Sequence, residues 1–128
     1  MFLKDEDYLR LLSDLDGYLG QSLVQDMSES AMQYDYPIGL LGDVRLHLNH
    51  YSDFADAKMQ WEKRLERLNR DNLFFMMYTC DRDNALAFSA LPYPRKVVFT
   101  PEDFGIECQI NLGRFLELID NNMEDFFK

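Results

Sequence analysis

The sequence predicts an α/β fold, with one mainly parallel, mixed sheet that carries helices on both faces in a single domain of residues 1–128. Three observations point to this fold: a helical pattern from Ser52 to Arg70, an apolar run at Leu73–Tyr78 and strict alternation at Asp43–Asn49. A helix that leads directly into an apolar strand is half of a βαβ unit. A chain of this length buries roughly two thirds of its unfolded surface, which is enough for one core.

The long helix is predicted by apolar residues that recur at steps of three and four, which places them on one helical face. These residues are Phe54, Ala57, Trp61, Leu65 and Leu68. Ser52 is positioned to cap the first turn, and arginines occupy the last turns, where they suit the negative end of the helix dipole. The run Leu73–Tyr78 shows no alternation, so we expect a strand covered on both faces in the middle of the sheet.

The chain before this helix contains one predicted helix and two predicted strands. Lys4–Leu19 has a continuous apolar stripe and ends at Gly20, which predicts one helix. Leu23–Met27 is a short strand, and Ser28–Tyr36 is polar and turn-like. The apolar segment Pro37–Leu41 is interrupted by glycine, so we expect a loop packed against the sheet.

The segment Asp43–Asn49 alternates between apolar and polar side chains. Val44, Leu46 and Leu48 share one face, and Arg45, His47 and Asn49 share the other. This pattern predicts a strand with one face in the core. Its polar face either marks a sheet edge or lines a cleft.

After the apolar run, the chain alternates again between helix and strand. Asp83 can cap a short helix at Asn84–Leu91, and Lys96–Thr100 is the next strand. Ile106–Ile110 is a further strand, and Arg114–Phe127 has a helical pattern.

The net charge of −10 is unevenly distributed along the chain. Residues 1–36 carry 2 basic and 8 acidic side chains, whereas residues 37–100 carry 9 and 8. No segment is strongly basic, which argues against binding to nucleic acid or to an anionic membrane surface. No apolar run is long enough to cross a bilayer and no signal peptide opens the chain, so we expect a cytoplasmic protein. Cys80 and Cys108 are expected to be free thiols.

Polar residues at predicted strand ends are the first candidates for a site, because ligands of parallel α/β sheets gather there. Asp81 and Asp83 follow the apolar strand and flank Arg82. Two carboxylates at this spacing can share a divalent cation, which can hold a diphosphate, while Arg82 can bind an anion. The structural alternative is that both carboxylates cap turns and that Arg82 pairs with a neighbour.

The second group of candidates lies on and after the alternating strand. His47 and His50 are candidate acid–base or ligand-contacting residues, although such histidines are more often solvated surface residues. Asp43, Arg45 and Tyr51 are supporting candidates for ligand binding, with Arg45 facing an anion.

Several short motifs occur together between Tyr36 and Thr100. In order they are Tyr36-Pro37 with Gly39-Leu40-Leu41, the strand with His47, His50 and Tyr51, Trp61 with its basic helix, Asn72, Asp81-Arg82-Asp83, Leu91-Pro92-Tyr93 and Lys96–Thr100. In this set the chain resembles the bacterial exopolysaccharide-biosynthesis-type proteins classed as domain of unknown function 1919. The earlier segment DYLRLLSDLDGYL is similar to the first helix of that family.

The chain differs from the pattern of that family in two respects. Members of that family usually start earlier, with a strand and a turn that this chain lacks, and beyond Pro101 the likeness fades. We therefore expect a fragment or an inactive relative, or an exposed strand edge that favours a homodimer.

The resemblance implies a role in surface-polysaccharide metabolism and supplies no catalytic residue. The leading expectation is a protein of exopolysaccharide or capsule biosynthesis that modifies or transfers a sugar. Its expected partner is a nucleotide sugar or a polysaccharide precursor, with a divalent cation as the candidate cofactor. The alternative is a non-catalytic binding or scaffold module in the same pathway.

Overall fold

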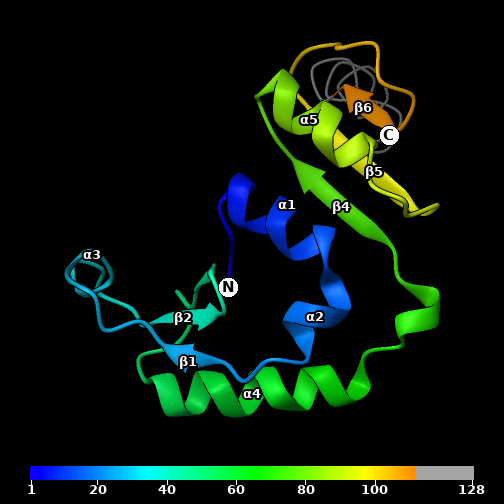
Figure 1. The fold of residues 1–128 in the computed structure, drawn as a ribbon. Coiled ribbons are helices and arrows are strands. Elements are labelled where there is room, and N and C mark those ends of the chain that lie inside the picture. Colours follow the sequence, from blue (N-terminus) through cyan, green and yellow to red (C-terminus); the bar gives the residue numbers. More distant parts are fainter. Residues whose placement is uncertain (112–128) are drawn as a thin grey trace, which may run out of the picture. The chain divides into compact units, whose positions relative to one another are not determined.

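The computed structural model describes residues 1–111 and divides the chain into two compact units, Met1–Asp71 and Asn72–Lys128. Each unit has a sheet of its own, one antiparallel and one parallel, each of three strands. Figure 1 shows the elements of both. The α/β class is confirmed, and the expectation of one mainly parallel sheet is wrong. The alternating strand pairs in a hairpin with the segment before it, and the strand that follows the long helix lies in the other sheet, so these elements do not form a βαβ unit.

The first unit contains β1 (Val24–Gln25), β2 (Ile38–Leu41) and β3 (Val44–His47), all antiparallel and in the order β1-β2-β3. Strand β2 occupies the segment that we expected to be a loop. Gly39 fits within this strand because the Leu23 side chain fills the space of its missing Cβ, which would lie 2.8 Å from Leu23 Cδ1. Gly42 begins the two-residue turn to β3 with a φ of +57°, as tight hairpins require.

The helices of the first unit are α1 (Asp5–Ser13), α2 (Leu15–Leu19), α3 (Glu29–Met32) and α4 (Phe54–Arg67). The single helix expected at Lys4–Leu19 is broken at Asp14, because that side chain accepts a hydrogen bond from Gly17 N and starts α2. The turn-like segment before β2 holds α3, which Ser28 caps. The cap of α4 is Asp53 rather than Ser52, since its carboxylate accepts from Ala55 N.

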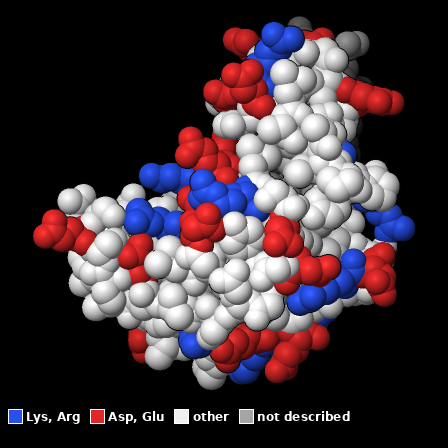
Figure 2. All heavy atoms as spheres, viewed as in Figure 1, with Lys and Arg blue, Asp and Glu red and all other residues white. Residues whose placement is uncertain are grey.

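The core of the first unit lies between the sheet and its helices. Buried leucines of α1, α2 and β3 meet Ala57 of α4, and Phe54, Trp61 and Leu65 pack against this cluster. The apolar face predicted for α4 is therefore confirmed, except that Leu68 lies beyond the helix and is exposed. Figure 2 shows acidic and basic side chains side by side along α4, at the bottom of the view. In the described part of the chain, no helix is both long and apolar enough to cross a membrane.

The second unit contains β4 (Phe75–Tyr78), β5 (Lys96–Thr100) and β6 (Gln109–Asn111), all parallel, in the order β4-β5-β6. Helix α5 (Arg82–Ser89) connects β4 to β5, so these three elements form the βαβ unit of the chain. A short 3₁₀ helix, η1 (Arg70–Asn72), precedes β4. The helix expected at Arg114–Phe127 lies outside the described residues.

Strand β4 differs from the expectation of a doubly covered central strand. Among residues 1–111 it is at the edge of its sheet, and its side chains alternate between buried and exposed. Phe75 and Met77 are buried, whereas Phe74, Met76 and Tyr78 are exposed. The unbroken apolar run at Leu73–Tyr78 therefore does not mean that both faces of β4 are buried.

Candidate functional site

His47 is the last residue of β3 and is completely buried. The N-terminal segment covers the free edge of β3 at this point, because Phe2 and His47 exchange two backbone hydrogen bonds of 2.9 and 2.8 Å. The Phe2 ring also stacks on the imidazole, with centroids 4.4 Å apart and an angle of 8° between the planes. A residue expected on a solvated polar face is thus enclosed by a segment more than forty positions away in the sequence.

Two tyrosines complete the surroundings of His47. Tyr34 meets the imidazole edge-on at 5.1 Å, and the Tyr36 hydroxyl lies 3.0 Å from Nδ1, at hydrogen-bond distance. Nε2 is buried without a hydrogen-bond partner among residues 1–111. We call Phe2, Tyr34, Tyr36 and His47 the aromatic cluster.

The aromatic cluster holds His47 in its neutral form. Burial lowers the pKa of His47 below its ordinary value of 6.5, and the positive charges of Lys4 and Arg45 lower it further, against a smaller opposite effect of Asp7. A neutral imidazole that is enclosed in this way packs as an aromatic ring. Its chemistry as an acid or base would first require Phe2 or a tyrosine to move.

We expect the stability of the first unit to fall as the pH is lowered below 6.5. Because folding lowers the pKa of His47, the unfolded chain takes up a proton first, and stability falls until the folded pKa is reached. The slope contributed by one such group is at most about 1.4 kcal/mol per pH unit. The measurement is urea unfolding followed by the fluorescence of Trp61, the single tryptophan, at several pH values.

The matched variants for this prediction are His47→Phe and His50→Gln, since His50 is exposed. His47→Phe should flatten the pH dependence between 6.5 and the folded pKa of His47, and His50→Gln should leave it unchanged. An unchanged slope in His47→Phe contradicts the prediction.

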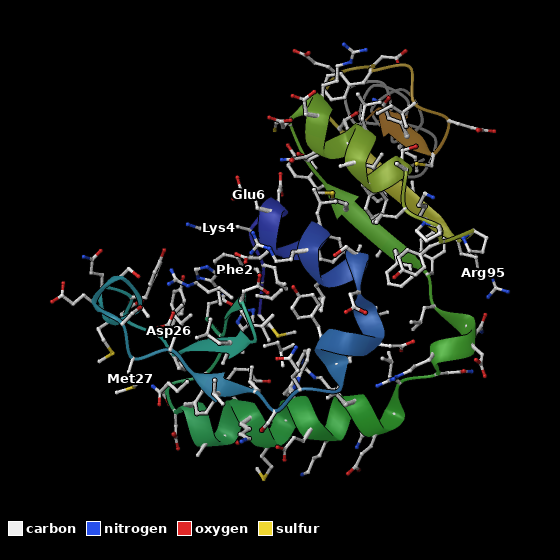
Figure 3. All side chains as sticks on the ribbon, in the orientation of Figure 1. Phe2, Lys4, Glu6, Asp26, Met27 and Arg95 are labelled. Carbon is white, nitrogen blue, oxygen red and sulfur yellow. The ribbon has the colours of Figure 1, made fainter. Side chains whose placement is uncertain are left out.

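Arg45, on the same strand, is held by an ion pair. Its guanidinium donates from Nη2 to Asp26 at 2.9 Å and to the Ser30 hydroxyl at 3.1 Å. Asp26 is nearly buried and also accepts from Ser28 N at 2.9 Å. Hydrogen bonds from Ser28, and then the charge of Arg45, lower the pKa of Asp26. Figure 3 shows Asp26 turned toward the sheet, whereas the next residue, Met27, points away from it.

An open cavity of about 430 Å³ lies beside the aromatic cluster. Its walls come from the end of β1, from α3, from the segment Tyr34–Ile38 and from the start of α4. Three aromatic residues (Tyr34, Tyr36 and Phe54) and three aspartates (Asp26, Asp35 and Asp53) line it, and among residues 1–111 no basic residue does. The cavity thus combines apolar ring surface with hydrogen-bond acceptors.

The other residues proposed on this strand and after it do not face this cavity. Asp43 is exposed in the hairpin turn, where it accepts from the Tyr18 hydroxyl at 2.6 Å and lies 3.5 Å from Arg10. The hydrogen bond from Tyr18 lowers the pKa of Asp43. His50 is exposed, and Tyr51 packs against the core of the first unit. Arg45 is engaged by Asp26, so its charge is already balanced.

Asp81, Arg82 and Asp83 belong to the second unit. Asp81 caps α5, since its Oδ1 accepts from Asn84 N at 3.0 Å, and its own N–H bonds to Thr79 Oγ1. Arg82 and Asp83 are exposed in the first turn of α5. The cap expected at Asp83 is thus at Asp81, two residues earlier. Within residues 1–111, no three His, Cys, Asp or Glu side chains are grouped so that they could hold a metal ion.

Sequence reasoning missed the walls of the cavity. Tyr34 and Asp35 lie in a segment that was interpreted only as a turn, and Asp26 lies in a short, poorly marked strand. The available signal was Tyr-Asp-Tyr-Pro at positions 34–37, where two large aromatic residues occur in a polar stretch. Aromatic side chains in such a segment usually have a packing partner or a ligand.

Comparison with known proteins extends the resemblance from half of the chain to nearly all of it. The family model described as "Domain of unknown function (DUF1919)" matches residues 1–127. An uncharacterized protein of Haemophilus influenzae is 32% identical over 142 aligned residues. The alignment covers 99% of this chain and 66% of that relative, so the chain spans just under two thirds of the relative's length. On these matches, the chain belongs to the DUF1919 family, whose function is unknown.

Proposed function

We propose that the protein binds a saccharide intermediate of bacterial exopolysaccharide or capsule biosynthesis, in the cavity of its Met1–Asp71 unit. The pathway is the one implied by the family resemblance. The observation that carries the saccharide is the combination of aromatic rings and carboxylates around one open cavity. In this proposal the protein acts as a binding module rather than as a catalyst.

A sugar ring presents two kinds of surface that this cavity can match. Its C–H groups form an apolar face that packs on an aromatic ring, and its hydroxyls donate hydrogen bonds to carboxylates. Tyr34 and Phe54 supply ring surface, and Asp35 and Asp53 supply acceptors. The volume of about 430 Å³ is in the range of small-molecule sites, which suits one or two sugar residues.

A nucleotide diphosphate suits this cavity poorly. Its phosphates would add negative charge beside carboxylates, and no basic residue of the described part of the chain lines the cavity to balance it. The proposed ligand is therefore the sugar itself or a polysaccharide precursor.

The test is saturation-transfer NMR and calorimetry with a panel of methyl glycosides. We expect Tyr34→Leu to weaken binding by about two- to tenfold, because an aromatic contact contributes roughly 0.5–1.5 kcal/mol beyond the area that it buries. Tyr34→Phe keeps the ring and should bind within about twofold of the natural chain. Unfolding of each variant, followed by Trp61 fluorescence, controls for damage to the fold. Failure of every glycoside to bind the natural chain contradicts the proposal.

A second candidate function is a sugar-modifying or glycosyl-transferring activity in the second unit. Strands β4 and β5 are parallel neighbours, and their carboxyl ends carry the buried hydroxyls of Thr79 and Thr100 beside Asp81 and Asp83. In this proposal a divalent cation and a nucleotide sugar would bind there.

The test of this second candidate is a thermal-shift screen against nucleotide sugars, with and without Mg²⁺ or Mn²⁺. A ligand at about one hundred times its dissociation constant adds roughly 2.7 kcal/mol, or a shift of several degrees. Asp83→Asn is the variant of choice, because Asp81 also caps α5. A cation-dependent shift that Asp83→Asn abolishes supports the candidate, and a flat screen contradicts it.

A further inference from the structure

We infer that the cavity of the first unit selects a cationic amino sugar over neutral and acetylated sugars. This inference rests on the proposed function, because it names the class of saccharide that the same cavity binds. It is carried by the charges on the cavity walls and by the rings between which they lie.

The carboxylates of the cavity are not equally available to a ligand. Asp26 is paired with Arg45 and nearly buried, so its charge is balanced. Asp53 uses Oδ1 to cap α4. Asp35 is exposed and has no hydrogen bond or ion pair within residues 1–111. A ligand in the cavity therefore meets the Asp35 carboxylate and the Oδ2 of Asp53, neither of which has a hydrogen-bond partner within residues 1–111.

The positive end of α4 is the feature that could favour an anion here. It opens at the cavity wall, since Asp53 and Phe54 line the cavity. The Asp53 carboxylate already accepts a hydrogen bond from Ala55 N in the first turn of this helix and places a negative charge at its positive end. No lysine, arginine or histidine among residues 1–111 lines the cavity, so the net charge of its described walls is negative.

The rings of Tyr34 and Tyr36 flank Asp35 in the sequence and lie 5.2 Å apart, tilted by 38°. Aromatic faces attract an ammonium group through their negative quadrupole. The Tyr36 hydroxyl is turned to His47, and burial raises the pKa of Tyr36, so this ring contributes a neutral surface. Two aromatic rings and a carboxylate that line one cavity can together bind an ammonium group.

The experiment compares three ligands that differ only at position 2 of the sugar: methyl glucosaminide, methyl N-acetylglucosaminide and methyl glucoside. Binding is measured by calorimetry at about pH 6.5, where most of the amine is protonated. We expect the amine to bind about tenfold more tightly than the other two, the usual gain from one charge-assisted contact in a partly exposed site. This preference should shrink at high salt, because added ions screen the Asp35 charge.

The matched variants are Asp35→Asn and Glu62→Gln, which each remove one negative charge from the first unit. Glu62 is exposed on α4 and does not line the cavity. Asp35→Asn should lower affinity for the amine to that of the neutral sugar, and Glu62→Gln should leave it within about twofold.

The experiment tests the preference for the amino sugar and the binding of saccharides separately. Tighter binding of the amine that Asp35→Asn abolishes supports the inference. Equal binding of all three glycosides overturns the charge selectivity and leaves saccharide binding in place. Failure of all three, together with the rest of the panel, overturns both.

Discussion

Phe88→Ala should lower the unfolding free energy of the second unit by about 3–5 kcal/mol, the usual cost of removing a buried phenylalanine ring. Phe88 is on the inner face of α5 and is completely buried. The unit has one connecting helix and three short strands in its described part, so few other side chains can fill the space that the ring leaves.

The measurement is urea unfolding by circular dichroism, together with hydrogen exchange of the Val98 amide, which bonds to Cys108 O. Leu86→Ala is the control, because Leu86 is on the same helix and 43% exposed. It should cost less than about 1 kcal/mol. Equal losses in the two variants would contradict the burial of Phe88.

Arg45→Met should lower the stability of the first unit by about 2–3 kcal/mol. The substitution leaves the carboxylate of Asp26 nearly buried without its cation, and such an orphaned charge is costly. The expected loss is below that of a fully buried pair because the Arg45 side chain is 28% exposed.

The double variant Arg45→Met with Asp26→Asn is the decisive comparison, because it removes both charges. It should recover at least half of the stability lost in Arg45→Met alone, as read from Trp61 fluorescence in urea. Arg10→Met serves as a control, because Arg10 forms exposed ion pairs with Asp7 and Asp43 at 3.3 and 3.5 Å. Exposed pairs contribute little, so this loss should stay below about 1 kcal/mol. If the double variant is no more stable than Arg45→Met, then the orphaned charge is not the cause of the loss.

The elements that the sequence predicts well are those specified by neighbouring residues. Strand β5 has the predicted bounds, Lys96–Thr100, and most of the apolar face of α4 lies in the core as expected. Both depend on local periodicity. Helix caps are less well predicted because several polar residues near the start of a helix can serve as the cap. Asp53 caps α4 in place of Ser52, and Asp81 caps α5 in place of Asp83.

The features that sequence reasoning missed depend on distant partners. Gly39 suggests a break in the strand when only the sequence is considered. In the structure, the Leu23 side chain occupies the space where a Cβ of residue 39 would lie. His47 reads as a surface residue until Phe2 and the two tyrosines enclose it. The same holds for the cavity, whose walls come from four separate segments. Periodicity describes which face a residue is on, and it does not say what covers that face.

Strand β4 places two consecutive methionines in opposite surroundings, which gives them different sensitivities to oxidation. Met76 is 58% exposed, whereas Met77 is 4% exposed. A sulfoxide at Met76 would add a polar group to a side chain that is already largely exposed to water. A sulfoxide at Met77 would put a polar oxygen into the core of the sheet, and repair by a reductase would first require the strand to open. Because side chains alternate between buried and exposed along this short strand, one of two chemically identical thioethers is open to oxidants and the other is protected.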